Sequence, residues 1–364
     1  MSLTSTLSDK NNQPLRDKFK TEFLRPEFKL QAELKAPPLT TNYTIVGTAF
    51  DYLMRFYLQR LNKDTFEDRG NWVADNAYES LTEHTLKRQG KETATGFRKD
   101  KIYKTKDLLK IITDQYSQTK KNYSKFLADG IITDELVANT LYLAKLDVYS
   151  RAGIIDQNFD FHNPDDITDI KAMLSLVDNE KFTAKSKCYF NPTFGGGSAI
   201  VNGADADLII DNILIDIKAT KNLKLERDHI NQTLGYYILS LIGGVNLKPF
   251  ARPIEHIGIY FARHGELWTV PISSFGDSKK FSDFKDWFIS YVKPKEKTLK
   301  EWYEIIEDFV QMAIRLDNRK SEPTKEKPKK KVATKKPVKK AAKKKEAPTK
   351  KKTATKKLSK RKIK

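Results

Sequence analysis

Cysteine is nearly absent from this chain of 364 residues, which holds a single one, Cys188. One cysteine excludes an intrachain disulfide framework and a four-cysteine zinc or iron–sulfur site. The five histidines are scattered and show no HxxxH or HExxH spacing, which disfavours a zinc hydrolase. No GK[ST] motif follows the triplet Gly195-Gly196-Gly197, so we interpret this triplet as a flexible connection between strands and not as a phosphate loop.

Long apolar runs are also missing. No stretch approaches the length of about 18 apolar residues that a membrane-spanning helix needs, so we expect no membrane span. The N-terminal sequence MSLTSTLSDKNNQPL lacks the apolar centre of a signal peptide, which favours a cytoplasmic or nucleoid-associated protein.

The positive charge of the chain is concentrated at one end. The net charge is +20, and residues 319–364 alone carry 23 lysines and arginines against 3 glutamates. The residues before Arg319 therefore hold 44 basic and 44 acidic side chains and are neutral overall. The tail 319–364 has few large apolar residues, so we expect it to be disordered. Such a polycation binds nucleic acid through counterion release, and a solubility or targeting role is the alternative.

The remaining chain divides by its sequence pattern. We expect an extended segment over residues 1–40 and then a domain over 41–318, which begins with a helix at 47–61. A helical insertion is expected over about 65–184, and a core of strands and helices over 185–292. In this core, β-branched and aromatic runs predict strands at 187–191, 199–202, 206–210, 213–219, 256–261 and 266–270. Helices are expected at about 226–241, 283–292 and 298–317, the last one opened by a capping box.

One segment, GADADLIIDNILIDIK at residues 203–218, has a pattern with chemical meaning. It predicts two strands joined by a two-residue turn at 211–212. The residues of one face are then apolar and buried, and they pair as Ile210 with Ile213, Leu208 with Ile215, and Ala206 with Ile217. On the other, water-facing side, Asp207 lies opposite Asp216, and Asp205 lies opposite Lys218.

Two aspartates in facing positions need an explanation. With Cβ atoms roughly 5 Å apart, like charges destabilise a strand pair. The pair is tolerable when one carboxyl group is protonated or when a cation lies between the two. Mg²⁺ is commonly held by one or two carboxylates together with water and phosphate oxygens. The alternative is an exposed hairpin in which Asp205 and Lys218 form a surface ion pair.

Motifs on both sides of the hairpin extend this pattern. The helix after it carries Gln232 and Tyr236 four residues apart, on one helix face. The helix before it begins near Gly47-Thr48-Ala49-Phe50-Asp51. A D…(D/E)xK hairpin followed by QxxxY and preceded by GTxxH resembles the RecB-like branch of the PD-(D/E)XK nucleases, over residues 43–61 and about 185–292. The resemblance implies an α/β fold with a restriction-endonuclease-like mixed β-sheet flanked by helices. The large helical insertion and the disordered C-terminal tail, expected from the sequence pattern, complete the predicted architecture.

The resemblance also implies a metal site. Asp207 and Asp216 correspond to the metal ligands, and the carbonyl group of Ile217 corresponds to a further one, for Mg²⁺ or Mn²⁺. Members of this branch usually have a histidine where this chain has Asp51. An aspartate can bind a hard cation through oxygen, whereas a histidine suits a softer metal better. Asp51 is therefore a candidate ligand, and a solvent-facing helix position is the alternative.

The other motif residues correspond to groups that act on the substrate. Lys218 corresponds to the residue that orients or deprotonates water and stabilises negative charge at the phosphate. Gln232 and Tyr236 correspond to residues that hold the substrate strand or the lysine.

The function implied by the resemblance is metal-dependent hydrolysis of DNA phosphodiester bonds. Because members with QxxxY are commonly exonucleases, we expect an exonuclease whose pocket and basic tail both bind DNA. A catalytically inactive nuclease fold that binds DNA through the tail is one alternative. A sequence-specific endonuclease of the restriction type is another.

Overall fold

The structure is a computed structural model that describes residues 2–67, 72–87, 94–98, 101–103, 105–153, 159, 161–246 and 253–292. All of these belong to one unit of the chain, Met1–Ser321. The helix expected at 298–317 and the lysine-rich tail 319–364 lie outside the described residues.

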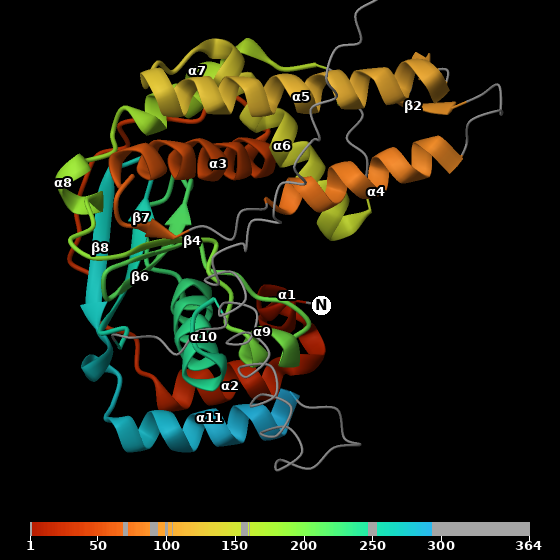
Figure 1. The fold of residues 1–364 in the computed structure, drawn as a ribbon. Coiled ribbons are helices and arrows are strands. Elements are labelled where there is room, and N and C mark those ends of the chain that lie inside the picture. Colours follow the sequence, from red (N-terminus) through yellow and green to blue (C-terminus); the bar gives the residue numbers. More distant parts are fainter. Residues whose placement is uncertain are drawn as a thin grey trace, which may run out of the picture. The chain divides into compact units, whose positions relative to one another are not determined.

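A six-stranded mixed sheet lies at the centre of the described unit (Figure 1). Its strands, in spatial order, are β1 (Phe66–Glu67), β4 (Cys188–Phe190), β5 (Leu208–Ile210), β6 (Ile213–Lys218), β7 (His256–Phe261) and β8 (Glu266–Pro271). The β1–β4 and β6–β7 pairs are parallel, and the other pairs are antiparallel. A separate two-stranded ladder joins β2 (Ala94–Arg98) to β3 (Lys101–Tyr103).

Helices cover both faces of the sheet, which confirms the expected α/β class with a flanked mixed sheet (Figure 1). On one face lie α3 (Tyr43–Leu61), α4 (Val73–Lys87), α5 (Thr105–Asp129), α6 (Asp134–Ala152), α7 (Pro164–Leu174) and α8 (Asn179–Phe182). On the other lie α1 (Leu3–Ser8), α2 (Gln13–Glu22), α9 (Gly196–Ile200), α10 (Arg227–Gly243) and α11 (Ser278–Val292). None of the helices in the described residues is long and apolar enough to span a bilayer.

The hairpin β5–β6 forms with the predicted turn. Ile210 pairs with Ile213 and Leu208 with Ile215, as expected. Asp211 has a φ of 51°, in the left-handed region that a tight turn needs and that Asp tolerates. The carboxylate of Asp211 also accepts hydrogen bonds from the backbone N–H groups of 185–187, which ties the turn to the segment before β4.

The hairpin β5–β6 packs against a core on each face, so the expectation that one of its faces meets water is wrong. Ile215 packs into the core beneath α3, whereas Ile209 and Leu214 pack into the core beneath α10. Asp216, on the same side as Leu214, has a side chain that is only 1% exposed. The reason is that α10 packs on this face of β6 and covers it.

The predicted pairing stops at Leu208. Ala206 and Ile217 are not a ladder pair, and Asp205 forms a β-bridge with Thr193 instead of pairing with Lys218. Residues 205–207 therefore diverge from β6, while their backbone stays hydrogen-bonded to residues 191–193. This departure frees the Asp207 side chain to reach across to the backbone of β6.

Two other expectations are corrected. Residues 1–40 are not extended throughout, because they form α1 and α2. These helices bury Leu3, Leu7, Leu15 and Phe19 in the core that also contains α10 and α11, and Phe23, directly after α2, is buried there too. Residues 199–202 are not a strand, since α9 begins within the glycine triplet. Helices α9 and α10 approach so closely that a Cβ atom at Gly243 would lie 1.9 Å from the carbonyl oxygen of Phe194. Gly197 and Gly243 thus permit the close contact between α10 and the segment around α9.

Candidate active site

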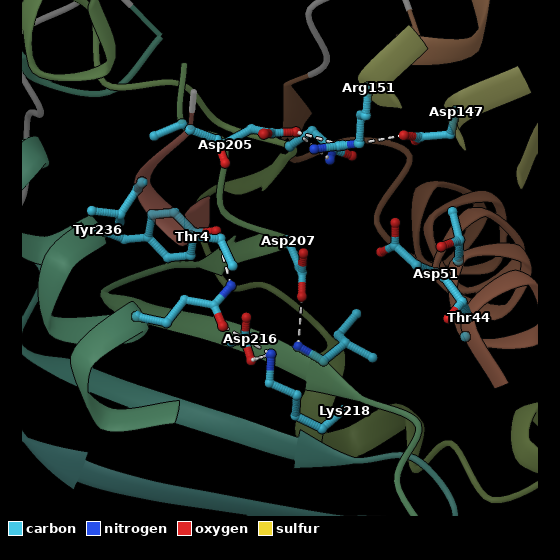
Figure 2. Close-up of a pocket in the computed structure, with 18 of the residues that line it drawn as sticks. Thr4, Thr44, Asp51, Asp147, Arg151, Asp205, Asp207, Asp216, Lys218 and Tyr236 are labelled. Carbon is cyan, nitrogen blue, oxygen red and sulfur yellow. Dashed lines mark hydrogen bonds and ion pairs between the residues drawn. The ribbon is translucent and has the colours of Figure 1, made fainter. Parts of the chain in front are cut away.

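A pocket of about 400 Å³ lies beside β6, where α3, α6 and α10 meet the hairpin (Figure 2). Segments far apart in the sequence contribute its walls, including α1 at the N-terminal end. All of the residues that the sequence pattern singled out line this one pocket, namely Asp51, Asp207, Asp216, Ile217, Lys218, Gln232 and Tyr236.

The two aspartates of the hairpin approach each other by different routes. Asp216 is part of β6, whereas Asp207 precedes β5 and accepts a hydrogen bond from the Ile217 N–H group at 2.6 Å. Burial, followed by the negative charges of Asp216 and Asp51, raises the pKa of Asp207 well above its usual value. The state in which both Asp207 and Asp216 are ionised is therefore unfavourable unless a cation lies near them. Without a cation, protonation of Asp207 relieves the repulsion.

Lys218 is held by a chain of polar contacts. Its Nζ atom lies 2.7 Å from Oδ2 of Asp216 and donates a hydrogen bond to Oε1 of Gln232 at 2.9 Å. Nε2 of Gln232 in turn donates to the Tyr236 hydroxyl at 3.1 Å. The spacing of four residues on α10 makes this relay possible. Of the two roles left open for Gln232 and Tyr236, the geometry matches contact with the lysine.

The environment of Lys218 favours its charged form. Burial lowers the pKa of Lys218, but the charges of Asp216 and Asp207 outweigh burial, so its pKa is raised. The side chain is 23% exposed and therefore still reaches the pocket. Lys218 is thus a fixed positive charge beside the two carboxylates.

One face of α3 forms the opposite wall of the pocket. Thr44, Gly47, Thr48 and Asp51 recur at spacings of one, three and four, so all four positions lie on one face of α3. Oδ2 of Asp51 lies 2.7 Å from Nη2 of Arg55, whereas its Oδ1 atom is buried and has no hydrogen-bond partner among the described residues. Burial raises the pKa of Asp51, and its ion pair with Arg55 offsets this only in part. Asp51 is thus a half-buried residue of the pocket wall, with 20% of its side chain exposed.

Two charged residues of the pocket, Asp147 and Arg151, were not anticipated from the sequence. Arg151 on α6 contacts the carboxylate of Asp147, one turn earlier, and its Nη2 atom lies 3.7 Å from Oδ2 of Asp205. An Asp–Arg pair four residues apart is common on exposed helices. No local signal in the sequence separates this pair from a surface pair, because its place in the pocket depends on how α6 packs against α3.

The donors in the pocket fit a hard divalent cation. Among the described residues, no group of three or more His, Cys, Asp or Glu side chains is arranged around a common metal position. Two carboxylates and a main-chain carbonyl are nevertheless present at Asp207, Asp216 and Ile217, and Mg²⁺ typically takes one or two carboxylates and keeps several water ligands. The buried oxygen of Asp51 without a donor is a further atom that a cation could satisfy.

No family model, curated protein or solved structure matches the chain in the comparisons. A functional assignment therefore depends on the residues of the pocket and on their geometry.

Proposed function

We propose that the chain is a metal-dependent nuclease of the PD-(D/E)XK type that hydrolyses DNA phosphodiester bonds, with Mg²⁺ or Mn²⁺ as cofactor. The observation that carries the proposal is the group formed by Asp207, Asp216 and Lys218, with the lysine tied to Gln232. A restriction-endonuclease-like fold is part of the proposal. It is supported by the antiparallel series β4–β5–β6, followed by α10 and the parallel strand β7.

The carboxylates of Asp207 and Asp216, with the carbonyl group of Ile217, are the groups that would hold the cation. When bound, the cation polarises the phosphate and lowers the pKa of a water molecule. The hydrogen bond from the Ile217 N–H group fixes the direction of the Asp207 carboxylate. Preorganised ligands of this kind reduce the reorganisation that the reaction requires.

Lys218 supplies a positive charge where negative charge develops on the phosphate. Its ammonium group remains in place because Gln232 accepts one of its hydrogen bonds and Tyr236 fixes Gln232. The raised pKa of Lys218 supports an electrostatic role over that of a general base.

The charge of the pocket supports a cation cofactor. The described lining includes five aspartates at positions 51, 147, 205, 207 and 216, but only two cations, Lys218 and Arg151. A phosphodiester group entering this pocket meets a net negative surface. Bound divalent cations reverse that repulsion, since the ion is then the largest local charge.

The proposal includes exonuclease activity and DNA as the partner. The QxxxY pattern at Gln232 and Tyr236 favours an exonuclease. The 23 basic residues of the tail favour a polyanionic substrate that is bound without regard to its sequence.

A catalytically inactive nuclease fold that binds DNA is the second candidate. Two observations favour it: Asp51 is paired with Arg55, and the described residues contain no three-ligand metal group. This candidate predicts DNA binding that is insensitive to EDTA and that is lost when residues 319–364 are deleted.

The test is cleavage of end-labelled DNA, linear and circular, single- and double-stranded, with Mg²⁺ or Mn²⁺ and with EDTA. We expect cleavage of linear substrates that stops with EDTA and falls by a factor on the order of 1,000 in Asp216→Asn and Lys218→Ala. Asp134→Asn is the matched control, because Asp134 forms an exposed ion pair with Lys171 outside the pocket. Discrete fragments from circular DNA indicate the restriction-type alternative. Full activity in Asp216→Asn contradicts the proposed site.

A further inference from the structure

A second pocket adjoins the candidate active site. It has a volume of about 690 Å³, and Ser2, Arg151, Ala204 and Asp205 line both pockets. The shared walls make one continuous depression with two parts. The second part lies away from the Asp207 and Asp216 carboxylates, since neither residue lines it.

Arg151 stands at the junction of the two parts. Figure 2 shows Arg151 and Asp205 on one side of the pocket and Lys218 on the opposite side, and Asp207 lies between these two sides. The Arg151 side chain is 54% exposed, although it forms an ion pair with Asp147, which lies one turn earlier on α6. Its contact with Asp205, at 3.7 Å, is longer than a normal charge-assisted hydrogen bond. Asp147 therefore orients the Arg151 guanidinium group, whereas Asp205 holds it only loosely. The group can bind an additional anionic partner.

We propose that Arg151 binds the backbone phosphate next to the scissile one, and that the second pocket holds the adjoining nucleotide of a single strand. This inference rests on the proposed nuclease function and names the substrate class of the same site. The planar, forked guanidinium group suits a phosphate better than any other side chain.

The lining of the second pocket has the mixed character that a nucleotide requires. Thr193, Asn202 and Ser5 offer hydroxyl and amide groups to a sugar or a base edge, and Val73 and Ala204 add apolar surface. Its volume lies within the range of roughly 300–1,000 Å³ that is usual for small-molecule sites. The substrate is therefore a polynucleotide strand that spans both parts. A small phosphodiester needs only the part beside Asp207 and Asp216.

The placement of Arg151 predicts effects that differ between two substrates. In Arg151→Ala of the full chain, kcat/KM for a short single-stranded oligodeoxynucleotide falls by about 10- to 100-fold, mainly through KM. Hydrolysis of bis(4-nitrophenyl) phosphate stays within about twofold of the parent protein, because this ester reaches no second phosphate site. Arg151→Lys is intermediate, since it keeps the charge but loses the fork.

A binding measurement tests the same contact without requiring catalysis. Fluorescence anisotropy of the labelled oligonucleotide, with Ca²⁺ in place of Mg²⁺, gives the dependence of log K on log salt. Loss of one phosphate contact lowers the slope by about 0.7 for a single strand. The basic tail contributes equally to the parent protein and to the variant. Lys171→Ala is the matched control, because Lys171 is 45% exposed and ion-paired with Asp134 outside both pockets.

The outcomes separate this inference from the proposed function. An unchanged salt slope and an unchanged KM in Arg151→Ala overturn the phosphate contact. An equal loss on both substrates overturns the second subsite and assigns Arg151 to the first pocket. A parent protein that cleaves neither substrate contradicts the nuclease proposal, whereas the salt slope still decides whether Arg151 binds a phosphate. Thermal unfolding of each variant shows that the fold is retained.

Discussion

Asp207→Asn tests the central pair of carboxylates most directly. The amide oxygen of asparagine can accept the Ile217 N–H hydrogen bond that Oδ2 of Asp207 accepts at 2.6 Å. The substitution therefore keeps the local geometry and removes a negative charge from a buried, like-charged group. We expect the metal-free variant to be at least as stable as the parent protein at neutral pH, and to lose both its response to metal and its cleavage of DNA.

The sign of the stability effect follows from the raised pKa of Asp207. The folded state binds this proton more tightly than the unfolded state does. The stability of the metal-free parent protein therefore falls as the pH rises from the unfolded pKa, about 3.9, towards the raised folded pKa. Asp207→Asn has no proton to lose, so it avoids this loss and its advantage over the parent grows across the same pH range.

The metal response of the parent protein has a predictable size. A cation that binds only the folded state stabilises it by about 2.7 kcal/mol at a concentration 100 times its Kd. In a folded unit of this size, 1 kcal/mol changes Tm by roughly 2 °C. We therefore expect Mn²⁺ or Mg²⁺ to raise the Tm of the parent protein by about 5 °C, and to leave the Tm of Asp207→Asn nearly unchanged.

The assay is thermal unfolding with EDTA and with increasing metal, followed by single-turnover cleavage of labelled DNA. Asp211→Asn is the matched control, because Asp211 lies in the same hairpin but binds backbone N–H groups of 185–187 and does not line the pocket. It should keep the full metal response. A metal-dependent rise in Tm that is equal in Asp207→Asn and the parent protein refutes the assignment of Asp207 as a ligand.

Two further predictions concern the relay and the helix contact. Gln232→Leu removes the hydrogen-bond acceptor for Lys218, so we expect kcat to fall about 10-fold with little change in KM. Gln232→Glu keeps an acceptor and should retain most activity. Equal kcat values in Gln232→Leu and the parent protein contradict the relay. Gly243→Ala places a Cβ atom 1.9 Å from the Phe194 carbonyl oxygen, and we expect a loss of about 3 kcal/mol, or roughly 6 °C in Tm. Gly47→Ala is its control in thermal unfolding, because that Cβ atom would lie at an ordinary 3.7 Å from Ala219, and an equal drop in both variants contradicts the close helix contact.

The sequence by itself determined the elements whose signals are local. The alternation of apolar residues in 206–217 and the turn at Asp211 specified the hairpin and its register near the turn. Both Asp207 and Asp216 line the pocket as expected, but Asp207 does so from outside the predicted strand pairing. The spacing of Gln232 and Tyr236 placed both on one face of α10. These inferences succeed because a strand period, a helix period and a turn conformation each depend on only a few neighbouring residues.

Only the tertiary structure decided which surfaces meet. The second face of the hairpin is buried because α10 packs on it, and the pairing beyond Leu208 gives way to the bridge between Asp205 and Thr193. The approach of Arg151 to Asp205 joins residues 54 positions apart, and α1 reaches the same pocket from the N-terminal end. Contacts of this kind depend on the packing of whole helices against the sheet, and no periodicity within one segment encodes that packing.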